Sequence, residues 1–250
     1  MENLNNAIVG QLVAENYHTA AVFKKFNIDF CCNGNHSIEE VCSRKNIDPA
    51  IVTAEISTIL GYRPGPEENY NIWNLDVLTD HIIKKHHQYV ETQIPILESF
   101  LHKLCSVHGP QHPELHEIAR LFNGSAAELT IHMKKEELML FPYIKQLVKA
   151  KSLGITASPA PFGNVANPVH MMMQEHDHEG ERFRQISALS NNYTTPPDGC
   201  NTYKVTYALL KEFQDDLHLH IHLENNILFP KAEQLEKELT TAAPSCSINR

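Results

Sequence analysis

The sequence of 250 residues lacks a long apolar run, a basic run and a convincing strand pattern. No segment approaches the roughly 18 uninterrupted apolar residues of a membrane helix, so we expect no membrane partner. The net charge of −9 and the missing basic run disfavour nucleic acid as a partner. Because no stretch alternates convincingly between apolar and polar residues, helices are the expected elements.

The N-terminus lacks the basic start and apolar run of a signal peptide, which predicts a cytoplasmic location. The six cysteines show no regular spacing, so we expect free thiols in place of a disulfide framework. Cys31 and Cys32 are the exception, although vicinal cysteines rarely form a disulfide with each other. They are either two small core residues at a turn or a thiol pair that binds metal, reacts with an oxidant or NO, or donates electrons.

Helical spacing and clusters of turn residues predict an all-α protein. Residues 1–62 contain short helical stretches and form a small N-terminal domain, followed by a Pro- and Gly-rich linker at residues 63–71. Residues 72–238 hold four long helical stretches with short connections, which predicts an up-down-up-down four-helix bundle. Residues 239–250 form a tail.

The bundle contains one motif twice, 88 positions apart. His132 precedes Glu136 by four residues, His220 precedes Glu224 by four, and Leu-Phe-Pro follows each pair at the same offset. Residues four apart lie on one face of a helix, so two such helices would bring two His and two Glu together. A single copy would more often be a surface pair, but the matching second copy favours a metal site.

The spacing repeats further, because His87 lies 45 residues before His132 and His176 lies 44 before His220. Each half of the bundle is therefore a predicted helix hairpin that carries two His and one Glu. Two carboxylates flanked by imidazoles are typical of a dinuclear iron or manganese site. The predicted ligands are His87, His132, Glu136, His176, His220 and Glu224.

For two further histidines, His86 and His108, the sequence leaves alternatives open. His86 is adjacent to His87 but lies about 100° away on the helix, so only one of them can face the site. The repeat spacing favours His87 only weakly. By spacing alone, His108 is a residue at a helix C-terminus, where the helix dipole favours it.

A proline lies inside each of the two helical stretches that carry a His-x-x-x-Glu motif. Pro142 and Pro230 should kink each helix about one turn past the ligand pair, or end it there.

The segment Asp29–Gly34, with the two His-x-x-x-Glu motifs, resembles the repair-of-iron-centres (RIC) family. This resemblance covers about residues 5 to 235 and implies an N-terminal Cys-Cys domain followed by a hemerythrin-like bundle. It implies a di-iron protein, with two iron ions as cofactor, that repairs iron–sulfur clusters damaged by nitrosative or oxidative stress. Damaged iron–sulfur proteins would be the clients, and NO or O2 the small ligands.

The resemblance also implies a ligand set. Its Val-His-Gly-Pro motif adds His108, so that one iron would have three His and the other two, while Cys31 and Cys32 match the family's thiol pair. Iron delivery and an enzymatic reduction of NO are both compatible with this pattern, and a hemerythrin-like carrier or sensor of O2 or NO is the alternative. The N-terminal domain is a candidate homodimer interface. The implied ligands are His87, His108, His132, His176 and His220, with Glu136 and Glu224 as bridges.

Overall fold

The computed structural model describes residues 4–61, 65 and 69–241. All regular elements in these residues are helices, and β-structure is limited there to two isolated bridges. The prediction of an all-α protein is confirmed. Across the same part of the chain, no helix is both long and apolar enough to cross a membrane.

Three of the predicted segments fall partly beyond this description. The residues outside it are 1–3 and 62 of the predicted N-terminal domain, 63, 64 and 66–68 of the predicted linker, and 242–250 of the predicted tail.

The chain divides into two compact units, and the division falls inside helices as well as in loops. Unit 1 comprises Met1–Leu78, Lys145–Pro159 and Ile221–Arg250, and unit 2 comprises Thr79–Ile144 and Ala160–His220. The helices that run through these boundaries without a break are α5 (Leu75–Ile82), α8 (Phe141–Leu153) and α10 (Asn201–Leu223).

Unit 1 begins with short helices, and side-chain caps fix the starts of α3 (Ile38–Lys45) and α4 (Pro49–Leu60). At the start of α3, Ser37 Oγ accepts a hydrogen bond from the Glu40 amide, and the Glu40 carboxylate accepts one from the Ser37 amide. Phe23 and Ile56 are fully buried in the core of this part. The elements are η1 (Leu4–Asn6), α1 (Val9–Glu15), η2 (Tyr17–Thr19), α2 (Ala20–Lys25), α3 (Ile38–Lys45), α4 (Pro49–Leu60) and η3 (Tyr70–Ile72).

The same unit contains the C-terminal elements η6 (Glu224–Leu228) and α11 (Phe229–Thr241). The side-chain amides of Asn225 and Asn226 donate hydrogen bonds of 3.2 Å to the carbonyls of Cys31 and Phe30, respectively. The His222 ring packs against Phe30 at 5.8 Å, and burial lowers the pKa of His222 to about 3. The loop that carries the cysteine pair is therefore attached to the helical turn that begins at Glu224.

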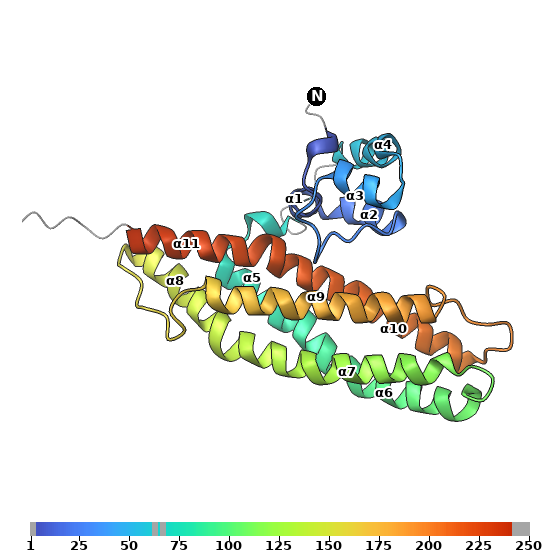
Figure 1. The fold of residues 1–250 in the computed structure, drawn as a ribbon. Helices are drawn as coiled ribbons and strands as arrows, with labels where there is room; N and C mark the ends of the chain where they lie inside the picture. Colours follow the sequence, from blue (N-terminus) through green and yellow to red (C-terminus); the bar gives the residue numbers. More distant parts are fainter. Residues whose placement is uncertain (1–3, 62–64, 66–68, 242–250) are drawn as a thin grey trace, which may run out of the picture. The chain divides into compact units, whose positions relative to one another are not determined.

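Unit 2 is built from long helices that run alongside one another (Figure 1). The Phe213 ring of α10 meets Tyr89, Phe122 and Phe183, which come from three other helices, at centroid distances of 6.1, 5.4 and 5.5 Å. This shared aromatic core confirms the predicted helical bundle. The other elements are η4 (Ile83–His87), α6 (Gln88–His108), α7 (Glu114–Lys135), η5 (Glu136–Leu140) and α9 (Ala166–Leu189).

Three turns of π-helix, namely η4, η5 and η6, interrupt the long helices. Pro142 and Pro230 follow the ends of η5 and η6 by two residues. A proline has no amide hydrogen, and its ring clashes with the carbonyl of the preceding turn, which a wider π turn relieves. The disturbance was expected one turn past the ligand pair, but it already starts at Glu136 and Glu224.

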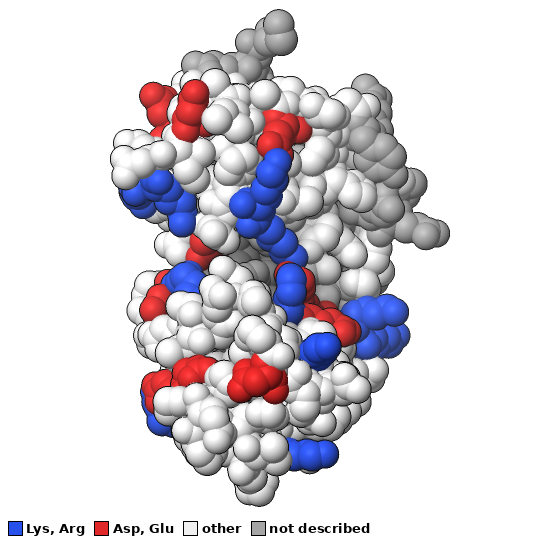
Figure 2. Space-filling view, turned by 90° about the vertical axis from the view of Figure 1, so that its right-hand side faces the viewer, with Lys and Arg blue, Asp and Glu red and all other residues white. Residues whose placement is uncertain are grey.

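Acidic and basic side chains lie interspersed on the face of the molecule that Figure 2 shows.

Candidate metal centre

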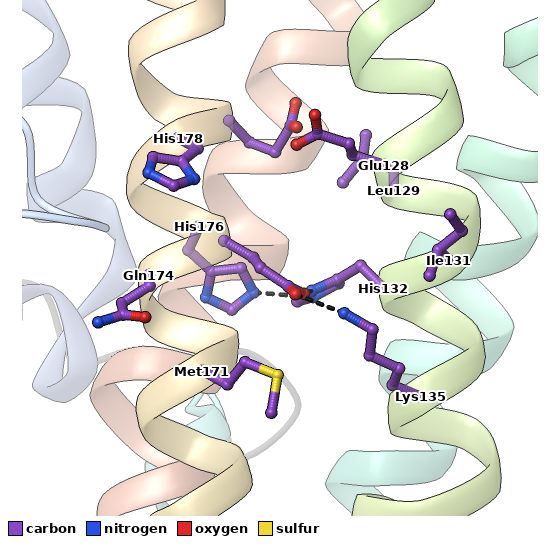
Figure 3. Close-up of a pocket in the computed structure, with 11 residues that line it drawn as sticks. Glu128, Leu129, Ile131, His132, Lys135, Met171, Gln174, His176 and His178 are labelled. Atoms are coloured by element: carbon purple, nitrogen blue, oxygen red, sulfur yellow. Dashed lines mark hydrogen bonds and ion pairs between the residues drawn. The ribbon is translucent and has the colours of Figure 1, made fainter.

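Six buried side chains, each at most 3% exposed, bring their nitrogen and oxygen atoms together. Figure 3 shows two of them, His132 on α7 and His176 on α9, pointing toward each other, and their Nε2 atoms lie 3.0 Å apart. The six form two groups in which the ligand atoms all lie within 4.8 Å of one another: His87, Glu136, His220 and Glu224 in the first, and His132, Glu136, His176 and Glu224 in the second.

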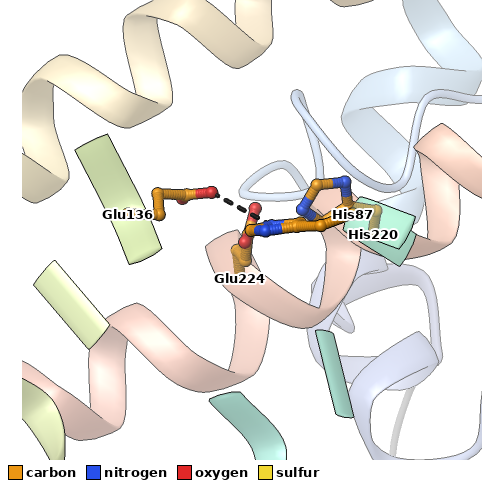
Figure 4. A group of neighbouring side chains, drawn as sticks. All are labelled: His87, Glu136, His220 and Glu224. Carbon is orange, nitrogen blue, oxygen red and sulfur yellow. Dashed lines mark ion pairs between the residues drawn. The ribbon is translucent and has the colours of Figure 1, made fainter. Parts of the chain in front are cut away.

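Glu136 and Glu224 belong to both groups, so two cations bound there would share both carboxylates. Figure 4 shows the first group around these carboxylates. Oε2 of Glu136 lies 3.4 Å from Nε2 of His87 and 3.4 Å from Nε2 of His132, and so stands between the two groups. Because α10 continues into η6 without a break, His220 and Glu224 are one turn apart on a single helical stretch.

The donor set fits iron. Carboxylates buried this deeply are costly unless they are paired or bind a cation. Imidazole nitrogen and carboxylate oxygen together suit iron and manganese, whereas structural zinc sites usually recruit cysteine. The residues present therefore match a dinuclear cation site.

Two further carboxylates orient the histidines. Nδ1 of His87 lies 2.9 Å from Oε1 of Glu137, and Nδ1 of His132 lies 2.7 Å from Oε2 of Glu175. The contact with His132, assisted by an ion pair with Lys135, lowers the pKa of Glu175 to about 2. A carboxylate that occupies Nδ1 turns Nε2 toward the metal and fixes the ring.

Comparison with known proteins agrees with this geometry. Residues 78–232 match the family described as "Hemerythrin HHE cation binding domain", and residues 5–60 match a "Domain of Unknown function (DUF542)". The iron-sulfur cluster repair protein YtfE of Shigella boydii is 34% identical over 224 residues, which cover 90% of this chain and 95% of that protein. The YtfE proteins of Musicola paradisiaca and Escherichia coli O8 are 32% and 33% identical over the same shares.

This chain belongs to the YtfE iron-sulfur cluster repair family. The resemblance predicted from the sequence motifs is thereby confirmed. All six clustered residues lie in the segment that matches the hemerythrin cation-binding family, and Cys31 and Cys32 lie in the N-terminal match.

The assignment of His108 as an iron ligand is wrong. His108 is the last residue of α6 and follows His87 by 21 residues, which places it about 30 Å further along the helix at 1.5 Å per residue. Its Nε2 lies 3.2 Å from Sγ of Cys200, and its ring packs against Tyr203. Each group therefore contains two His. The expectation of three His at one iron and two at the other depended on His108 and is wrong with it.

His86 is the alternative that the sequence left open; its ring stacks on His220 at 5.5 Å, but it belongs to neither group. Its Nδ1 lies 2.9 Å from Oδ1 of Asp216, while His87 joins the cluster. Sequence reasoning missed Glu137 and Glu175, although each is adjacent in sequence to a predicted ligand, Glu136 or His176. Their position next to a predicted ligand is the sequence signal that could have identified these two carboxylates.

In this member of the YtfE family, Cys31 and Cys32 lie outside both His/Glu groups. They form a third group with Asp29. All five cysteines in the described part of the chain are free thiols, as expected.

A cavity of about 400 Å³ opens between α7 and α9, and His132 and His176 line it (Figure 3). Lys135 and Met171 stand at the same cavity. The second His/Glu group therefore has space beside it for a small molecule or an ion.

Proposed function

We propose that this protein is a di-iron protein that repairs iron–sulfur clusters damaged by nitrosative or oxidative stress. The observation that carries the proposal is the pair of ligand groups that share Glu136 and Glu224. Relatives that match 90% of the chain are named iron-sulfur cluster repair proteins, which supports the same function. Damaged iron–sulfur proteins are the proposed clients.

In this proposal His87 and His220 would hold one iron, and His132 and His176 would hold the other. Glu136 and Glu224 belong to both groups and would serve both ions. Iron in such a site would supply electrons and a binding position for NO or O2. The chain itself orients the imidazoles through Glu137 and Glu175 and keeps the carboxylates buried.

Protonation of these imidazoles or carboxylates would lower the affinity for iron, because they bind metal in their deprotonated forms. The cavity beside His132 and His176 provides room for an ion that leaves or a small ligand that enters. Iron delivery and removal of NO use the same six residues. The free thiols fit a reducing cytoplasm as the place of action.

Two measurements on one variant test the proposal. The wild-type protein should contain two irons per chain by elemental analysis and Mössbauer spectroscopy, and Glu136→Ala with Glu224→Ala should lose both. The same variant should no longer restore activity to an NO-damaged [4Fe–4S] dehydratase. Glu98→Ala removes an exposed helical carboxylate and serves as the matched control.

Two irons bound to the double variant would refute the ligand set. A stable, reversible oxygen adduct of the wild-type protein without repair activity would favour the carrier function instead. Homodimerisation through the N-terminal domain stays a prediction, which light scattering of the full chain checks.

A further inference from the structure

We propose that Asp29, Cys31 and Cys32 form a separate mononuclear site for a divalent transition-metal ion. The three residues lie in the loop between α2 and α3, and their ligand atoms are all within 4.8 Å of one another. None of them belongs to the His/Glu groups.

The distances from Cys31 Sγ to the other two atoms suit one tetrahedral ion. Sγ of Cys31 lies 3.7 Å from Sγ of Cys32 and 3.4 Å from Oδ1 of Asp29. With metal–sulfur bonds of about 2.3 Å and a metal–oxygen bond of about 2.0–2.2 Å, tetrahedral angles separate two sulfurs by about 3.8 Å and a sulfur from an oxygen by about 3.6 Å. An ion could therefore bind with little movement of the loop.

Hydrogen bonds hold the Asp29 carboxylate in place. Its Oδ1 accepts the amides of Cys31 and Cys32 at 3.1 and 3.0 Å, and its Oδ2 accepts the side-chain amide of Asn33 at 2.8 Å. A ligand oriented in advance loses less entropy when the ion binds.

Contacts from two other segments hold the loop itself. Asn225 donates to the carbonyl of Cys31 at 3.2 Å, and the Gly10 amide donates to the carbonyl of Gly34 at 2.7 Å. A side chain at Gly10 would clash, because its Cβ would lie 2.4 Å from Oδ1 of Asn226. The thiol pair is thus presented by a supported turn.

Without a metal, the Cys31 thiol is in its neutral form. A hydrogen bond with Cys32, burial and the nearby Asp29 carboxylate raise the pKa of Cys31 well above its usual value. Binding of one divalent ion breaks two S–H bonds, forms two metal–sulfur bonds and releases two protons to solvent. Two thiolates and one carboxylate would neutralise the two positive charges of the ion and leave one negative charge on the site.

Three protein donors leave one tetrahedral position open, unlike the four donors of a closed structural zinc site. Cys31 is buried, whereas Cys32 and Asp29 are half-buried, so two of the three donors are accessible from solvent. Thiolates select zinc, ferrous iron and similar ions over magnesium or calcium. A use of this site to hold iron in transit rests on the proposed repair function, but metal binding there does not.

Cobalt(II) is the probe, because thiolate ligands give it a near-ultraviolet charge-transfer band that His and Glu ligands do not. The full-length protein, reduced with a phosphine and kept anaerobic, is titrated with cobalt. We expect one thiolate–cobalt site per chain and release of two protons for that ion. Cys31→Ser with Cys32→Ser should abolish the band.

Three further variants make the result decisive. Cys200→Ser removes an exposed thiol elsewhere and should leave the band intact. Asp29→Asn keeps both thiols and an oxygen acceptor, and should weaken cobalt binding about tenfold or more. Glu136→Ala with Glu224→Ala should lose the bundle metals and keep the band.

No band in the wild-type protein, or a band that survives Cys31→Ser with Cys32→Ser, overturns the proposal. A band that depends on Cys200 does the same. Failure of the repair proposal is a separate result, because it would show in iron content and cluster repair while the cobalt band stays unchanged.

Discussion

His108 lies beside a thiol instead of a metal. The hydrogen bond between His108 and Cys200, together with the backbone amides of Tyr203 and Thr202, lowers the pKa of the Cys200 thiol to about 7. Cys200 is exposed and directly precedes α10, where the helix dipole also favours an anion. The thiolate is the reactive form of cysteine, so this thiol should react at neutral pH.

We expect alkylation of Cys200 by iodoacetamide to rise with pH around a midpoint near 7, because only the thiolate reacts. His108→Ala should move the midpoint toward the ordinary value of about 8.5 and slow the reaction at pH 7 about threefold. Mass spectrometry of the peptide follows the rate. His102→Ala, on the exposed face of the same helix, is the control, and an unchanged midpoint in His108→Ala would contradict the prediction.

Glu175 contacts a proposed ligand without being one. Glu175→Gln should weaken metal binding about 10- to 100-fold, because His132 would lose the charged partner that fixes its ring. Competition with a chelator measures the affinity. Glu181→Gln removes an exposed carboxylate on the same helix and should have no effect. Equal affinities for wild-type protein and Glu175→Gln would show that Glu175 has no orienting role.

Within each helix, a π turn lies between the proposed Glu ligand and the proline that follows it. Pro142 and Pro230 lie two residues past the ends of the π turns that start at Glu136 and Glu224. A π turn adds one residue to a helical turn and so rotates the remainder of the helix by about 100°. The direction in which each carboxylate points therefore depends on a proline about one and a half turns away.

Pro230→Ala should favour a regular α-helix, since proline costs about 3 kcal/mol more than alanine inside a helix. We expect lower iron content together with an unfolding temperature of the metal-free protein that is unchanged or higher. Pro95→Ala replaces a proline inside α6, away from the ligands, and should leave iron content unchanged. Full iron occupancy in Pro230→Ala would show that metal binding does not depend on this proline and its π turn.

Helical spacing alone predicted which residues could meet on one helix, and this suffices for His132 with Glu136 and His220 with Glu224. The same rule would have rejected His108, because 21 residues of helix separate it from His87. The partnership of His132 with Glu175 could not be predicted in this way. It depends on which faces of α7 and α9 pack together, which tertiary contacts decide.

For the whole molecule, the metal should contribute to stability as well as to chemistry. Without a cation, Glu136 and Glu224 bring two buried carboxylates into one small space. A ligand that binds only the folded state stabilises it by about 2.7 kcal/mol at 100 times its dissociation constant.

Removal of metal with a chelator should therefore lower the unfolding temperature by several degrees, measured by calorimetry. In Glu136→Gln with Glu224→Gln the chelator should have little effect, because the variant binds metal weakly and lacks the paired charges. Identical unfolding temperatures of the wild-type protein with and without metal would contradict this expectation.

Each ligand group takes one histidine from each half of the repeat: His87 and His220 in one, His132 and His176 in the other. Neither hairpin alone contains a complete set for even one ion. A chain cut between α8 and α9 would hold its metal only while both fragments stay together, so iron retention would report on the integrity of the polypeptide. A lone hairpin of this kind could form such a group only by pairing with a second hairpin.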